Sequence, residues 1–102
     1  MMKVVKFGGS SLADAGQIQK AAAIIKAEAD RRYVVPSAPG KRFKDDIKVT
    51  DMLYQCYALA EKGEAFATQL AAIKDRYVSI LNGLSMPETL LDEEFVTIGE
   101  NF

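Results

Sequence analysis

Residues 3–11, KVVKFGGSS, place a short apolar run directly before two glycines and two serines. The run Lys3–Phe7 is rich in β-branched residues, which predicts a buried strand. Gly8 and Gly9 end that strand, because glycine favours turns and lets a ligand or another backbone come close. The stretch therefore predicts a strand that runs straight into a tight turn.

A helix and a second strand are predicted beyond this turn. Asp14 and Gln17 have the spacing of a capping box, and apolar residues then recur at helical intervals. Residues 33–37 (YVVPS) predict a strand, in which Pro36 removes one ladder donor. Strand, helix and strand in this order predict a right-handed βαβ unit with parallel strands.

The middle of the chain predicts a charged loop and then a helix. Residues 38–48 (APGKRFKDDIK) have the composition of a loop. Thr50 is predicted to cap the helix that follows, and Gly63 to end it. Cys56 falls inside this helix and is the only cysteine, so we expect a buried thiol and no internal disulfide.

A longer helix is predicted over residues 64–82, with Gly83 as its stop. Pro87 is predicted to open a short acidic turn of helix, and residues 95–98 (FVTI) to form another strand or extended segment. The apolar stripe of the long helix consists of Phe66, Leu70, Ile73, Tyr77 and Leu81.

The composition limits the function. The 102 residues are 49% hydrophobic and 26% charged, as expected for one small soluble domain or part of a larger one. Thirteen Lys and Arg against fourteen Asp and Glu give a net charge of -1, which argues against nucleic acid or anionic membrane as a partner. The absence of histidine excludes an imidazole general base and His-based metal sites, so we predict no metal site. No segment reaches the length of a membrane span, and we expect a cytoplasmic protein.

The stretch KFGGSS can bind an anion. Lys6 stands at the carboxyl end of the predicted strand, where open α/β sheets bind ligands. Backbone N–H groups of Gly8, Gly9 and Ser10 can turn towards a phosphate, and a helix starting just beyond would add its N-terminal dipole. The stretch is not a Walker A sequence, because the lysine precedes the glycines. The residues alone leave a phosphate site and a plain turn both open.

Other stretches each have an ordinary structural explanation. Ser37 can simply form a turn with Gly40, and Thr50 can simply cap a helix. Glu100 can be a solvated carboxylate in a surface turn, here preceded by Gly99. The basic residues Lys41, Arg42 and Lys44 precede Asp45 and Asp46, a sequence typical of a mixed-charge solvated loop.

Taken together and in order, these stretches resemble aspartate kinases, of the amino acid kinase superfamily. KFGGSS resembles the family signature, VVPSAPGKR with KVTDML resembles its second strand, loop and next helix, and IGENF resembles a segment with a Gly-Glu pair. The resemblance implies an α/β fold, the truncated N-terminal part of a three-layer α/β/α sandwich with a mainly parallel sheet. Residues 1–102 would be the aspartate-binding side of the catalytic domain, without the nucleotide-binding half or the ACT regulatory domains.

The resemblance also implies a reaction, in which ATP with Mg²⁺ phosphorylates the β-carboxylate of L-aspartate on the way to lysine, threonine and methionine. Lys6 would stabilise charge on the transferring phosphoryl group. The other implied contacts are Gly8, Gly9 and Ser10 with the phosphates, Ser37 and Thr50 with aspartate, and Glu100 with the α-ammonium of aspartate.

Two other kinds of protein remain as alternatives. Glutamate and carbamate kinases are close relatives, but the serine after the glycine pair, SAPGKR and VTD favour aspartate. A stand-alone ligand-binding or interaction module would instead expose the stripe of the long helix to a partner. As a kinase segment, the chain alone should turn over little or no ATP. A severed sheet leaves strand edges unpaired, so we also expect a homo-oligomer.

Overall fold

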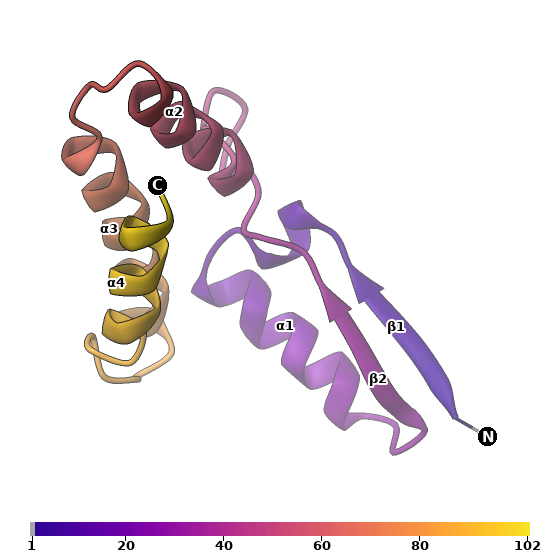
Figure 1. Ribbon diagram of the computed structural model, residues 1–102. Helices are drawn as coiled ribbons and strands as arrows, with labels where there is room; N and C mark the ends of the chain where they lie inside the picture. The colour runs from indigo at the N-terminus through magenta and orange to yellow at the C-terminus, as the bar shows by residue number, and fades with distance from the viewer. Residues whose placement is uncertain (1) are drawn as a thin grey trace. The chain divides into compact units, whose positions relative to one another are not determined.

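The computed structural model describes residues 2–102, which fall into two compact units (Figure 1). The first unit ends at Lys48 and the second runs from Val49 to Phe102. Among residues 2–102 there is no helix with both the length and the apolar character needed to cross a membrane.

The first unit is a βαβ unit. Its elements are β1 (Lys3–Phe7), the 3-10 turn η1 (Gly9–Leu12), α1 (Ala15–Lys26) and β2 (Arg31–Pro36). The two strands are parallel, and α1 runs alongside them (Figure 1). The α/β class, the parallel pairing and the bounds of β1 are confirmed, while β2 begins and ends slightly before the predicted residues 33–37.

Helix α1 begins as the sequence predicts. The Asp14 carboxylate accepts a 2.9 Å hydrogen bond from the Gln17 N–H, which would otherwise have no partner in the first turn. The Asp14 carbonyl accepts the first helical bond from Ile18 at 3.0 Å. The cap therefore fixes where the chain leaves the glycine turn and becomes helix.

The two faces of the strand pair differ in exposure. Phe7 is buried, whereas Val4 is 69% and Val35 is 53% exposed. Pro36 does not weaken the pairing of the strands, because Ser37 donates its N–H to the Phe7 carbonyl at 3.0 Å. Alternate residues of a strand face the same neighbour, so the donor that Pro36 lacks would point away from β1.

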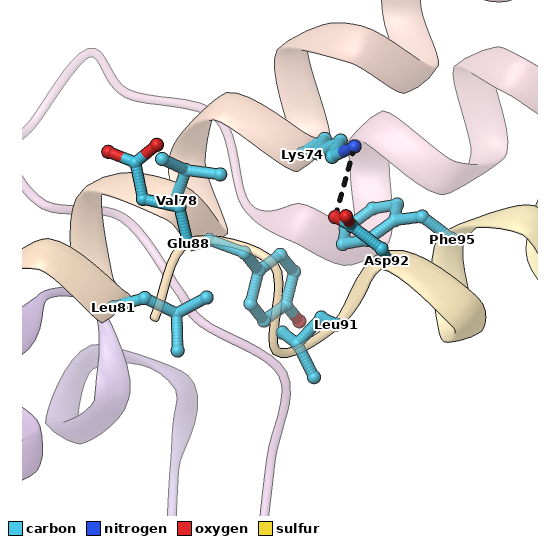
Figure 2. A pocket seen from close by; sticks show the side chains of 8 residues that line it. Lys74, Val78, Leu81, Glu88, Leu91, Asp92 and Phe95 are labelled. Carbon is cyan, nitrogen blue, oxygen red and sulfur yellow. Dashed lines mark ion pairs between the residues drawn. The ribbon is translucent and has the colours of Figure 1, made fainter. Parts of the chain in front are cut away.

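The second unit consists of α2 (Val49–Glu61), α3 (Ala67–Gly83) and α4 (Asp92–Asn101). The Tyr77 and Phe95 rings meet edge to face with centroids 5.7 Å apart. Figure 2 shows this contact region, where Leu81 and Leu91 line a narrow pocket and Lys74 pairs with Asp92 at 3.3 Å. The buried apolar residues of the unit are Val49, Cys56, Ile73, Ile80, Leu81 and Phe95.

Two predictions for this unit are wrong. Residues 95–98 lie within α4 and form no strand. A short apolar run does not by itself distinguish strand from helix, and Asp92, Glu93 and Glu94 favour a helix by interacting with its N-terminal dipole. Thr50 is not a cap, because α2 already begins at the fully buried Val49 and Thr50 lies exposed in its first turn.

The ends of the helices follow the glycines only in part. Gly63 adopts a positive φ of 72° just after α2, and the Glu64 N–H returns to the Leu59 carbonyl at 2.9 Å. After α3, Gly83 is the last helical residue and Ser85 takes the left-handed conformation, with φ 58°. The Met86 N–H then bonds to the Leu81 carbonyl at 2.9 Å, which closes the end of the helix.

Candidate functional site

Lys6 lies at the carboxyl end of β1, opposite Val35 of β2. Its neighbours Val5 and Phe7 are the more covered residues of the strand, so Lys6 projects from the opposite face. Lys6 is exposed and has no ion-pair partner among residues 2–102. The strand thus presents an unpaired cation near its carboxyl end.

The glycines lead into the 3-10 turn and not directly into α1. Gly8 is extended, with φ -75° and ψ 172°, and Ser11 donates its N–H to the Gly8 carbonyl at 3.1 Å. Gly9 and Ser10 open the turn, and the first N–H groups of such a turn have no acceptor within it. These two amides, next to Lys6 in sequence, are suited to contact an anion.

The predicted contribution of a helix dipole needs correction. The helix α1 does follow the glycines, but its first turn is already capped by the Asp14 carboxylate. A negative charge held at this N-terminus opposes a second anion there. Within this unit, the amides of the turn and Lys6 are the groups suited to bind phosphate.

The loop after β2 packs directly against the glycine turn. The Gly40 N–H donates to the Gly9 carbonyl at 2.7 Å, and the Ser37 N–H anchors the start of the loop to β1. A Cβ added at Gly40 would lie 2.5 Å from the carbonyl carbon of Gly9 and 2.8 Å from the nitrogen of Ser10. Gly40 is therefore needed for close backbone approach. Ser37 and the GGSS turn lie at the same end of the strand pair, as the parallel strands predict.

Within the charged loop, Arg42 and Asp46 form an ion pair, where the sequence predicts only a mixed-charge solvated loop. The Asp46 carboxylate accepts hydrogen bonds from Arg42 Nε at 2.6 Å, from Arg42 Nη2 at 2.9 Å and from the Arg42 backbone N–H at 3.0 Å. The Asp46 side chain is only 8% exposed. Arg42 holds the pKa of Asp46 well below the usual range of an aspartic acid. The i, i+4 spacing of opposite charges was the available sequence signal.

Thr50 and Glu100 belong to the second unit. Thr50 is exposed on α2, where it borders a groove of about 430 Å³ with Leu53, Tyr54 and Tyr57. Glu100 is exposed in the last turn of α4. Both side chains are accessible to a ligand, and their contacts with aspartate stay predictions.

The remaining features of the second unit are structural. Cys56 is fully buried in α2, as predicted, and burial raises the pKa of its thiol, which makes it a poor nucleophile. The stripe that a stand-alone interaction module would expose is largely covered, since Ile73 and Leu81 are buried. No group of three or more His, Cys, Asp or Glu side chains gathers as a metal site within residues 2–102.

The chain is similar to known proteins in both sequence and structure. The family model described as "Amino acid kinase family" matches residues 1–99. The chain is 43% identical to Aspartokinase 3 of Bacillus subtilis (strain 168) over 93 residues, which cover 90% of this chain and 20% of that protein. The crystal structure of the aspartate kinase of Clostridium acetobutylicum matches with a TM-score of 0.79 and 46% identity, over 82% of this chain and 19% of that one. The chain thus spans about a fifth of the length of each.

Proposed function

We propose a function that proceeds from one fact: the chain belongs to the amino acid kinase family. Within that family, we propose that it is the N-terminal, aspartate-binding part of an aspartate kinase. The reaction would transfer the γ-phosphoryl group of ATP to the β-carboxylate of L-aspartate and give aspartyl phosphate. The nucleotide-binding half and any ACT domains would be supplied by other segments.

The observation that carries this proposal is the grouping at the carboxyl ends of β1 and β2. Lys6 brings an unpaired cation, Gly9 and Ser10 bring backbone amides, and Ser37 begins the loop that packs on them. Cations and oriented amides are the groups that stabilise a phosphoryl group in transfer. An ordinary turn between a strand and a helix does not need the close approach of the Gly9 and Gly40 backbones that is found here next to the unpaired Lys6.

Phosphoryl transfer to a carboxylate requires few other catalytic groups. The acceptor carboxylate is already ionised at neutral pH, so no general base is required. Catalysis would rest on holding the two substrates in line and on neutralising charge as the phosphoryl group moves. Mg²⁺ would enter with ATP as part of the co-substrate, while Lys6, Gly8, Gly9 and Ser10 contact phosphate oxygens.

The amino acid acceptor would be bound by the remaining predicted residues. Ser37 and Thr50 would hydrogen-bond aspartate, and the Glu100 carboxylate would pair with the α-ammonium group. The similarity to two aspartate kinases, at 43% and 46% identity, favours aspartate over glutamate or carbamate as acceptor. As parts of the same proposal, we place the protein in the cytoplasm, at the first step towards lysine, threonine and methionine.

We also propose that the chain self-associates. Among residues 2–102 the sheet has two strands, so β1 and β2 each have one edge without a strand partner there, and Val4 and Val35 are exposed nearby. Light scattering of the purified chain would measure this, and a monomer at micromolar concentration would refute it.

Two assays test the proposed reaction. The chain alone, given L-aspartate and MgATP in a coupled ADP-release assay, should show little or no turnover, and robust turnover would contradict its role as one part of the catalytic domain. A chimaera of the Bacillus relative, with its matching segment replaced by this chain, should phosphorylate aspartate. Turnover with glutamate but not aspartate would overturn the choice of acceptor.

Lys6→Ala in that chimaera tests the central residue. Removing one preorganised charge contact to a transferring group lowers kcat by about 10²–10³-fold. The KM for aspartate should stay within about twofold, because Lys6 is proposed to act on the phosphoryl group and not on the amino acid. Lys20→Ala, an exposed lysine on α1, is the matched control. Equal effects of the two substitutions would remove Lys6 from the mechanism.

A further inference from the structure

The loop of residues 37–48 joins the two predicted aspartate contacts, Ser37 and Thr50, and contains neither helix nor strand. Segments of this kind are mobile unless their backbone is tied down. The start of this loop is tied by the Ser37 and Gly40 N–H groups, which donate to the carbonyls of Phe7 and Gly9. The second half lies beyond these contacts and needs another restraint.

Arg42 and Asp46 provide that restraint. Three donors of Arg42 converge on one carboxylate, at 2.6, 2.9 and 3.0 Å, and two of them belong to the planar guanidinium. This fork geometry fixes direction as well as distance. The Asp46 N–H also donates to the Phe43 carbonyl at 3.1 Å, and the guanidinium carbon lies 5.6 Å from the centre of the Phe43 ring. Residues 42–46 thus form a closed turn inside the loop.

The two charges of this pair are unequally accessible. The Asp46 side chain is 8% exposed, whereas that of Arg42 is 41% exposed. A largely covered carboxylate that loses its guanidinium donors has a desolvation cost, while an exposed guanidinium that loses its partner is solvated by water. Removing Arg42 should therefore disturb the loop more than neutralising Asp46. For an ion pair exposed on both sides, the two substitutions would have equally small effects.

Resting on the proposed function, we propose that Arg42 and Asp46 are a positioning pair: they hold the second half of the 37–48 loop, the part that leads to the predicted aspartate contact Thr50. Neither side chain is assigned a contact with substrate. Because each neutralises the other, the pair adds no net charge to the site. Its effect should appear in aspartate binding and not in the phosphoryl-transfer step.

The first test uses the 102-residue chain and does not depend on kinase activity. Trypsin can cut the loop after Lys41, Arg42, Lys44 and Lys48, and Asp46→Asn leaves all four sites in place. Asp46→Asn should speed cleavage within the loop roughly fivefold, the loss expected for one charge-assisted pair. Asp45→Asn removes the same charge from the neighbouring residue and should leave the rate unchanged. Equal cleavage of Asp46→Asn and the parent chain would overturn the inference.

The second test uses the chimaera described above, with separate KM and kcat measurements. Asp46→Asn should raise the KM for aspartate roughly fivefold, and Arg42→Met roughly tenfold, with kcat and the KM for ATP within about twofold. Asp45→Asn should match the parent. A fall in kcat without a change in the aspartate KM would mean that the pair does not position the acceptor.

The two tests separate the possible failures. If the parent chimaera phosphorylates an acceptor other than aspartate, the proposed function fails, and the pair must then raise the KM for that acceptor. If the parent uses aspartate but the KM does not respond to Asp46→Asn or Arg42→Met, the positioning role fails and the proposed function stands. A circular dichroism spectrum equal to that of the parent shows that a variant is folded.

Discussion

The glycine turn of the first unit and the helices of the second are packed in opposite ways. At the turn, two backbones touch: Gly9 and Gly40 approach so closely that a Cβ at Gly40 would lie 2.5 Å from the Gly9 carbonyl carbon. Among the helices, side chains fill the space, with Ile73 only 1% exposed and the Tyr77 and Phe95 rings 5.7 Å apart. The first arrangement has no room for a side chain, whereas the second depends on side-chain volume.

This difference bears on function. A contact between backbones leaves amide groups at the surface and brings two loops to fixed positions, which suits a site for anions. A contact between apolar side chains gives stability but offers few polar groups to a ligand. Substitutions should therefore damage the two units in different ways, and the following predictions are arranged by the size of that damage.

The largest loss of stability should come from Ile73→Ala. Ile73 lies on α3 and lines a cavity of about 200 Å³ with Val49 and Leu53 of α2 and Phe95 of α4. Truncating a buried isoleucine costs about 2–5 kcal/mol, and we expect about 3 because the enlarged cavity adds to the lost contacts. Urea unfolding monitored by circular dichroism measures the change.

The control for Ile73→Ala is Val96→Ala, since Val96 is 61% exposed on α4. That substitution should change the free energy of unfolding by less than about 0.5 kcal/mol. Amide hydrogen exchange of β1 and β2 in the same samples would show whether the loss is confined to the helices. A loss below about 1 kcal/mol for Ile73→Ala would contradict the role of side-chain volume in this unit.

Gly40→Ala should cause the next largest loss of stability, because the added Cβ collides with backbone atoms and does not change the packing of side chains. The added Cβ must displace the Gly9 carbonyl or the Ser10 amide, at a cost of about 1–3 kcal/mol. The same displacement should weaken aspartate phosphorylation in the chimaera. For stability alone, Gly8→Ala is the control, because a Cβ there meets nothing within 4 Å and the extended backbone suits any residue. Similar losses in the free energy of unfolding from both substitutions would show that close packing is not what Gly40 provides.

Asp14→Ala should cost less, about 1 kcal/mol, the usual contribution of a helix cap. The substitution removes the acceptor of the Gln17 N–H, 2.9 Å away, and exposes the first turn of α1. Asp14→Asn keeps an acceptor oxygen and should restore most of the loss. Thermal unfolding of the parent and the two variants measures these differences. If the Asn variant were as unstable as the Ala variant, the charge of Asp14, and not its hydrogen bond, would stabilise the helix.

The first unit could be predicted closely from its sequence because its signals are local. The β-branched run fixed β1 to the residue, and the spacing of Asp14 and Gln17 located the start of α1. The parallel order of the strands then brings Ser37 to the same end as the GGSS turn. The Gly9–Gly40 contact could not be predicted, since no local pattern states which glycine of one loop will touch a glycine of another.

The errors in the second unit have a common physical cause. The run at residues 95–98 reads equally well as strand or helix, and it is the packing of Phe95 against Tyr77 that accompanies the helix. Thr50 has the right chemistry for a cap, but the buried Val49 already belongs to the first turn. In both cases a contact distant in sequence or a neighbouring buried side chain accompanies the observed structure.

The smallest effect should come from the ion pair between α3 and α4, drawn in Figure 2. Lys74 Nζ lies 3.3 Å from Asp92 Oδ1, but both side chains are nearly half exposed, at 45% and 46%. Water and salt screen such a pair, so a double-mutant cycle of Lys74→Met and Asp92→Asn should give a coupling of about 0.3 kcal/mol. The cycle is needed because Asp92 also stands in the first turn of α4, where its charge has a separate favourable interaction with the helix dipole.

The coupling should fall further between about 0.05 and 0.5 M salt, as the screening length shortens. A coupling above about 1 kcal/mol that resists salt would show that charge helps to hold α4 on α3, and packing by Tyr77 and Phe95 alone would no longer account for the contact.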